Sequence, residues 1–311
     1  FKGISGFIDP NGRSIKLLDI SESGSVEFKM PRFSEATLFS EYGNKLFSGF
    51  HDAALYKNKG DAIYEVRDFE NAIEEYSKAI RINPKNSSLY RSRGDAKSEC
   101  IEHEDAIDDY TKAIEINPCD IYSYTSRACS KFVLKDFQGA IDDYTKAIEL
   151  SPFDVQIYGK RGFMKYELKD YHGAIEDYTK AIAIYPKYGT AFRMRAVVKE
   201  ILKDYEGAIN DFTKALENNF SEYMLKDEEI IDDQDLYFSR GIMKDKQKDH
   251  QGAINDFTKA IEIYPRHGNA FLNRGFAKEE LEDYQGAIED FTKAKEINPV
   301  EFDDYIRYGE D

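Results

Sequence analysis

One phrase recurs along the chain at a fixed spacing, and this repeat constrains the fold more than any other feature of the sequence. Two of its copies read FQGAIDDYTKAIELSP and DYHGAIEDYTKAIAIYP. Its anchoring alanine falls at Ala72, Ala106, Ala140, Ala174, Ala208, Ala253 and Ala287. Five of the six steps between these alanines are 34 residues and one is 45. A period of this length is typical of stacked helical repeats, so the sequence predicts seven units with an 11-residue insertion after the fifth.

Each unit contains two successive helical patterns. The first carries an aromatic residue and, four positions later, a small one that lets two helices approach closely, as in Tyr158 and Gly162. The second is usually preceded by an aspartate, as at Asp136 and Asp170, which is a favoured N-cap. Its apolar residues recur at helical spacing. A proline then predicts where it ends in every unit except the fifth, which has Phe220 there.

The order of these positions resembles the 34-residue helix-turn-helix of the tetratricopeptide repeat family. The resemblance covers residues 53–222, which form units one to five, and residues 234–299, which form units six and seven. It implies an all-α fold, an α-solenoid in which the helix pairs form a right-handed superhelix. It also implies a concave groove, lined by the first helix of each unit, that binds peptides or partner proteins.

Four segments lie outside the seven units. Residues 1–33 alternate short apolar stretches with turn signals, which predicts a small β-hairpin or meander. Residues 34–52 are interpreted as a degenerate second helix that caps the array. The insertion at 223–233 is acidic and is expected to leave units five and six stacked. Residues 300–311 form a C-terminal tail or partial cap.

Composition and charge argue against several classes of function. The 311 residues include 43 basic and 59 acidic ones, so the net charge of −16 repels phosphate backbones and anionic lipid. We therefore expect neither nucleic acid nor a membrane as partner. The three cysteines, at unrelated spacings, argue against a disulfide framework or a zinc site, and they favour a cytoplasmic protein with reduced thiols. Whether the chain is exported stays open.

No arrangement typical of an active site is recognisable. Paired carboxylates such as Asp142 and Asp143 recur in nearly every unit, which favours a structural role over acid-base chemistry. The sequence has no Ser/His/Asp or Cys/His set and no phosphate-binding glycine-rich loop. Enzymatic activity, a cofactor and a metal site are therefore not predicted.

A charge pattern connects the two helices of each unit. The seventh residue is basic and the twenty-third is acidic. The seventh residues are Lys59, Arg93, Arg127, Arg161, Arg195, Arg240 and Arg274, and the twenty-third are Glu75, Asp109, Asp143, Asp177, Asp211, Asp256 and Asp290. Arginine seldom faces the interior of a helix pair unless it is paired, so we predict a ladder of partly buried ion pairs within the units.

The positions expected to line the groove change from unit to unit. The ninth residues are Asp61, Asp95, Cys129, Phe163, Val197, Ile242 and Phe276. The polar, acidic entrance therefore gives way to an aromatic middle. We expect a partner to bind at Tyr122, Cys129, Phe132, Lys160, Phe163, Tyr166 and Arg193, with the rings as anchor and the cations setting orientation. The alternative is that the aromatic residues pack against neighbouring helices as core.

Two functions follow from this pattern. The first is a scaffold or adaptor that captures a peptide or a segment of a partner protein in the groove. The second is a regulatory or partner-sensing array of a larger enzyme or enzyme complex, because fold alone does not decide function. The clamp with which some tetratricopeptide proteins grip the C-terminal carboxylate of heat-shock chaperones is not expected, because only Lys57 matches it.

Overall fold

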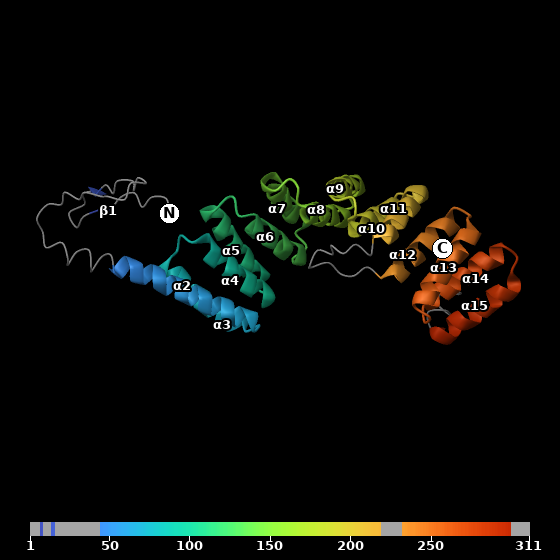
Figure 1. Ribbon diagram of the computed structural model, residues 1–311, viewed down its shortest axis with the longest axis horizontal. Coiled ribbons are helices and arrows are strands. Elements are labelled where there is room, and N and C mark those ends of the chain that lie inside the picture. Colours follow the sequence, from blue (N-terminus) through green and yellow to red (C-terminus); the bar gives the residue numbers. More distant parts are fainter. Residues whose placement is uncertain (1–6, 9–13, 16–43, 219–231, 300–311) are drawn as a thin grey trace, which may run out of the picture. The chain divides into compact units, whose positions relative to one another are not determined.

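The computed structural model describes residues 7–8, 14–15, 44–218 and 232–299 (Figure 1). Two short strands, β1 (Phe7–Ile8) and β2 (Ser14–Ile15), pair antiparallel with Phe7 opposite Ile15. The remainder of the hairpin or meander expected for residues 1–33 lies outside the described residues and stays a prediction. The described part of the chain also contains fourteen helices, α2 to α15.

The helices alternate as first and second helices of the seven predicted units. The first helices are α2 (Asn44–Glu65), α4 (Ser87–Glu99), α6 (Ile121–Val133), α8 (Val155–Glu167), α10 (Gly189–Ile201), α12 (Asp233–Lys246) and α14 (Gly268–Glu280). The second helices are α3 (Phe69–Ile82), α5 (His103–Ile116), α7 (Phe137–Leu150), α9 (Tyr171–Ile184), α11 (Tyr205–Asn218), α13 (His250–Ile263) and α15 (Tyr284–Ile297). This order confirms the all-helical repeat fold expected from the sequence.

Local signals explain where the second helices begin. The side chain of Asp136 accepts a hydrogen bond from the backbone N–H of Gly139 at 3.0 Å, and Asp170 accepts one from Gly173 at 3.0 Å. These bonds satisfy amide groups that have no partner inside the helix, so both predicted N-caps are confirmed. The turn before each cap contains one residue in the left-handed region, for example Lys135 with φ 62°.

The first helix differs from the expectation. Residues 34–52 were predicted to form a separate capping helix, but α2 runs without a break from Asn44 to Glu65, through the expected boundary. Phe50 occupies the repeat position at which most units have the proline that ends the second helix. Phe50 has the backbone N–H group that proline lacks. The helix therefore continues into the first unit. Residues 34–43 lie outside the described part of the chain.

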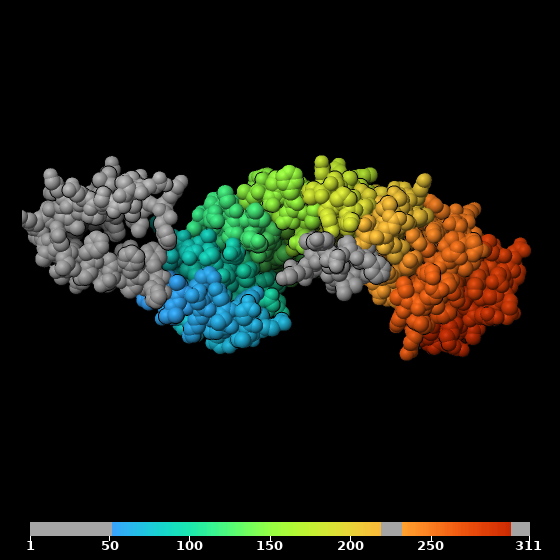
Figure 2. All heavy atoms as spheres, viewed as in Figure 1, coloured from blue at the N-terminus to red at the C-terminus, as the bar shows by residue number. Residues whose placement is uncertain are grey.

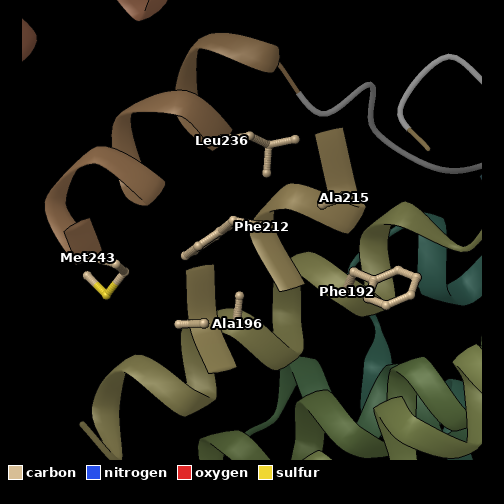
Figure 3. Packing of buried hydrophobic residues seen from close by; sticks show 7 residues of the cluster. Phe192, Ala196, Phe212, Ala215, Leu236 and Met243 are labelled. Atoms are coloured by element: carbon tan, nitrogen blue, oxygen red, sulfur yellow. The ribbon is translucent and has the colours of Figure 1, made fainter. Parts of the chain in front are cut away.

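Neighbouring units pack through buried apolar clusters. Figure 3 shows the cluster of units five and six, where Phe212 of α11 lies between Ala196 of α10 and Leu236 of α12. Phe212 and Leu236 are each 1% exposed. The expectation that the insertion leaves units five and six stacked is therefore confirmed, although residues 219–231 themselves lie outside the described residues.

The first helices of successive units also meet one another. Contacts join α4 to α6, α8 to α10 and α12 to α14. Figure 2 shows the atoms of successive units, from green to yellow, in direct contact. The first helices therefore share one face, which we call the first-helix face, and side chains from adjacent units meet on it. The right-handed superhelix implied by the resemblance stays a prediction.

Candidate partner-binding face

Four aromatic side chains form a row on units three and four, which we call the aromatic row: Phe132, Phe163, Tyr166 and Tyr171. The rings of Phe132 on α6 and Phe163 on α8 meet edge to face with centroids 5.7 Å apart. Phe163 and Tyr166 stack at 6.1 Å, and Tyr166 contacts Tyr171 at 6.2 Å. Ring pairs of this kind contribute about 0.5–1.5 kcal/mol beyond the burial of their area. The row therefore connects two units as one surface.

The aromatic row belongs partly to the core. Phe132 and Phe163 pack against a buried cluster that includes Tyr144. Tyr166 and Tyr171 pack against a second cluster that includes Tyr178. All four side chains of the row are nevertheless only half-buried. The rings therefore pack between helices, as the alternative interpretation expects, and keep some surface in solvent, while partner binding at this surface stays a prediction.

The other predicted residues differ in exposure. Tyr122, in the first turn of α6, is 71% exposed, and the guanidinium of Arg91 lies 5.5 Å from its ring centroid. Cys129 is exposed, with its Sγ 3.3 Å from the hydroxyl of Tyr144. Lys160 on α8 is also exposed. Tyr122 and Cys129 lie on α6 with Phe132, and Lys160 lies on α8 with Phe163.

Arg193 on α10 is half-buried and unusual in its contacts. Its Nε atom is buried and has no hydrogen-bond partner in the described structure. The hydroxyl of Tyr178, on α9, is likewise buried without a partner among the described residues. Burial raises the pKa of Tyr178, and the positive charge of Arg193 acts on this pKa in the opposite direction. The two groups are therefore electrostatic neighbours.

The residue at position nine explains why Tyr178 lacks a partner. In units one and two, the tyrosine at position 24 donates to an aspartate at position nine: Tyr76 to Asp61 at 3.0 Å and Tyr110 to Asp95 at 2.9 Å. In the fourth unit position nine is Phe163, which offers no acceptor. Tyr178 was not among the residues predicted from the sequence, although a comparison of positions nine and 24 across the units identifies it.

The predicted ion-pair ladder is confirmed in all seven units. The distances between the basic nitrogen and the carboxylate oxygen run from 2.5 to 2.9 Å. In unit three, for example, Nε and Nη2 of Arg127 each donate to one oxygen of Asp143. In every unit that has paired carboxylates, one member of the pair therefore has a structural role, as predicted from the sequence.

The ladder contains two further partners that the sequence analysis did not identify. A lysine four positions after each arginine binds the same carboxylate at 2.7–2.9 Å. Nη1 of each arginine also donates to a serine or threonine hydroxyl of the preceding unit at 2.9–3.0 Å. The ladder thus joins neighbouring units, and across the insertion Arg240 still reaches Thr213.

Metal sites, membrane-spanning helices and pockets were also considered as functional features of the described residues. Over the described ranges, no group of three or more His, Cys, Asp or Glu side chains is placed to hold a metal ion. The helices described here include none that is long and apolar enough to span a membrane. A pocket of about 320 Å³ lies in units six and seven, away from the aromatic row, and its lining includes Tyr264, Arg266 and Ile297.

Comparison with known families identifies the repeat. Residues 60–99 match the family described as TPR repeat, and residues 155–188, 234–267 and 268–301 match the family described as Tetratricopeptide repeat. Each of the last three matches covers one helix pair of the structure, in units four, six and seven. The chain therefore belongs to the tetratricopeptide repeat family.

Known proteins resemble this chain over different lengths. A TPR repeat-containing protein of Methanocaldococcus jannaschii is 36% identical over 76 residues, which are 23% of this chain and only 13% of the relative. A tetratricopeptide repeat protein from Parabacteroides merdae has a TM-score of 0.56 and 19% identity, covering 83% of this chain and 98% of that one. YrrB, described as a TPR protein with an unusual peptide-binding site, has a TM-score of 0.52 and 25% identity, covering 61% and 92%.

Proposed function

We propose that this chain is a protein-interaction scaffold that binds a peptide or an extended segment of a partner protein across the aromatic row. The observation that carries the proposal is the row itself, four half-buried rings in mutual contact on units three and four. A few well-packed aromatic anchors typically supply most of the binding energy of an interface. Partially exposed rings on a shared face are suited to that role.

The surroundings of the row support the same function. Tyr122 and Cys129 extend the exposed surface along α6, and Lys160 adds a positive charge on α8. The solved structure of YrrB, which resembles this chain, is described as having a peptide-binding site. The regulatory alternative would use the same face and would differ only in the enzyme to which the array is coupled.

A peptide selection tests the proposal without knowledge of the natural partner. A random library of 12-residue peptides displayed on phage is panned against the full chain, and an enriched peptide is titrated by calorimetry. Phe163→Ala should weaken binding by at least about 1 kcal/mol, because truncating an aromatic anchor removes its contact with the peptide. Failure of the chain to enrich any peptide would contradict the proposal.

Controls separate binding from packing, since Phe163 also contacts the core. Lys146 is exposed and, within the described ranges, pairs only with Glu149, at 2.7 Å, so Lys146→Ala should change neither binding nor stability appreciably. Tyr122→Ser removes an exposed ring and should weaken binding without lowering the melting temperature. If Phe163→Ala binds like the wild type but melts much earlier, the row is core and the proposal is wrong.

A further inference from the structure

The fourth unit contains a buried hydroxyl group without a partner beside the aromatic row. Tyr178 is 1% exposed, and its hydroxyl has no hydrogen bond within the described residues. Buried polar groups in folded proteins are nearly always hydrogen-bonded, so such an exception points to a missing partner. In the second unit the equivalent hydroxyl of Tyr110 donates to Asp95 at 2.9 Å.

The neighbouring arginine lacks a partner as well. Arg91 occupies position five of unit two and donates to both oxygens of Asp120, at 2.9 and 3.0 Å. Arg193 occupies the same position in unit five, but in the described part of the chain it forms no ion pair and its buried Nε has no acceptor. A cationic donor and a neutral donor on the packed helices α10 and α9 therefore act on each other, and neither has an acceptor among the residues that the structure describes.

Four positions of the first helices carry charge of one sign in units three to five, while the carboxylates of Asp177 and Glu167 also act on Tyr178. At positions two, five, six and nine of units three to five, the only charged residues are Lys160 and Arg193. In units one and two, the same positions include Asp61 and Asp95. This stretch is thus cationic in a chain whose net charge is −16, so a negatively charged group is the complementary ligand.

We propose that the bound segment places the carboxylate of an aspartate or glutamate side chain against Arg193, with the hydroxyl of Tyr178 as a second donor, while an adjacent apolar side chain lies on the aromatic row. The inference rests on the proposed function and specifies its partner as an acidic segment with an apolar anchor. A guanidinium donates two parallel hydrogen bonds to a carboxylate, which fixes orientation as well as adding energy.

The burial of the Tyr178 hydroxyl sets a requirement for binding. Because this atom is covered, neighbouring side chains must move for a carboxylate to reach both donors. Arginine has a long, flexible side chain, and no carboxylate of the described structure holds this one in place. Side-chain rearrangement of this kind is common when interfaces form.

The experiment uses the phage-selected peptides of the previous section. Peptides displayed at the N-terminus of a coat protein have no terminal carboxylate, so any enriched acid must be a side chain. One enriched peptide and its Asp→Asn or Glu→Gln version, both synthesised as C-terminal amides, are titrated against the wild type, Arg193→Gln, Arg193→Lys and Tyr178→Phe. The matched control is Arg81→Gln, which removes the same charge at an exposed site on α3.

Specific fold changes are expected. Arg193→Gln should weaken binding of the acidic peptide about tenfold or more and binding of the amide version by less than about twofold. The reason is that hydrogen bonds to charged groups are stronger than those between neutral groups. The loss of binding in Arg193→Lys should lie between these values, since lysine keeps the positive charge but lacks the planar guanidinium that donates two parallel hydrogen bonds. Tyr178→Phe should weaken the acidic peptide about threefold yet melt no earlier than the wild type, because it removes an unsatisfied buried hydroxyl.

Four outcomes would overturn the inference. If the enriched peptides contain apolar residues with no preference for acids, the carboxylate site is wrong and the proposed function stands. The same conclusion follows if Arg193→Gln weakens the acidic and amide peptides equally, or if Arg81→Gln weakens the acidic peptide as much as Arg193→Gln does. If no peptide is enriched at all, both proposals are wrong.

Discussion

The first three units and the last three place an aromatic ring at the same position of the repeat, with different chemistry around it. At position 24 the ring lies against the small residue at position eight, as Tyr110 does against Gly94 and Phe257 against Gly241. In units one to three this ring carries a hydroxyl that meets a polar group at position nine. In units five to seven the ring is phenylalanine and position nine is apolar.

This difference shows that positions nine and 24 act as a pair. A polar pair satisfies its hydrogen bond and an apolar pair buries no polar atom, so both arrangements are stable. The fourth unit combines Tyr178 with Phe163 and satisfies neither arrangement. Locally inconsistent choices of this kind are expected at functional sites, and this one lies beside the aromatic row.

The largest predicted effect concerns the ladder, which both regions share. Asp143→Ala leaves the charges of Arg127 and Lys131 without their common acceptor, and should lower the free energy of unfolding by about 3–5 kcal/mol. Asp256→Ala in unit six should cost a similar amount, because its contacts are the same. Chemical denaturation followed by circular dichroism measures both.

The neighbouring carboxylate provides the control for the ladder. Asp142 is exposed and accepts one hydrogen bond, from Gln138 at 3.0 Å. Asp142→Ala should therefore change the free energy of unfolding by less than about 0.5 kcal/mol. A loss below about 1 kcal/mol for Asp143→Ala, or clearly unequal losses in units three and six, would show that the ladder does not stabilise the two regions alike.

An intermediate effect is predicted for exchanging the rings between the two regions. Phe212→Tyr buries a hydroxyl against Val197 and should cost about 1–3 kcal/mol, the range for an unsatisfied polar group. Tyr110→Phe removes the donor of Asp95 and should cost about 1 kcal/mol.

A double-mutant cycle tests whether the two positions form a pair. Adding Val197→Asp to Phe212→Tyr recreates the polar arrangement of the first units and should recover part of the loss, giving a favourable coupling energy. Denaturation of the four proteins of this cycle measures the coupling. Strictly additive losses would mean that positions nine and 24 act independently.

The smallest effect is a difference in pH dependence between two acids of the first units. Burial raises the pKa of Asp95, despite the hydrogen bond from Tyr110, whereas hydrogen bonds from Lys78 and Lys59 lower the pKa of Glu75. A raised folded-state pKa costs stability when the group is charged, and this cost disappears as the pH falls. A lowered pKa adds stability above the unfolded-state value of about 4.5 that is lost in acid.

Urea unfolding between pH 7 and pH 3 separates the two acids. Compared with Asp95→Asn, the wild type should gain stability as the pH is lowered from 7 through the folded-state pKa of Asp95. Compared with Glu75→Gln, it should lose stability once the pH falls below about 4.5. Each difference should be about 1 kcal/mol or less, and parallel pH profiles of wild type and variant would contradict the assignment for that residue.

The sequence alone determined the repeat, most helix boundaries and the ion-pair ladder. Helical spacing, an aspartate at an N-cap or a proline after a helix acts within one or two turns, so each is readable without knowing the fold. The ladder was also predictable because the same two charges recur at one separation in every unit. The first helix departed from its predicted boundary because Phe50 lacks the backbone restriction of proline.

The candidate site was only partly readable from the sequence. Phe132, Phe163 and Tyr166 could be assigned to one face by their positions in the repeat, and the structure brings their rings into contact. Tertiary structure alone decided how much of each ring stays exposed, and that Arg193 acts on the buried hydroxyl of Tyr178. Both depend on packing between helices of different units, which fixes side-chain burial and hydrogen-bond partners through contacts that no local pattern in the chain encodes.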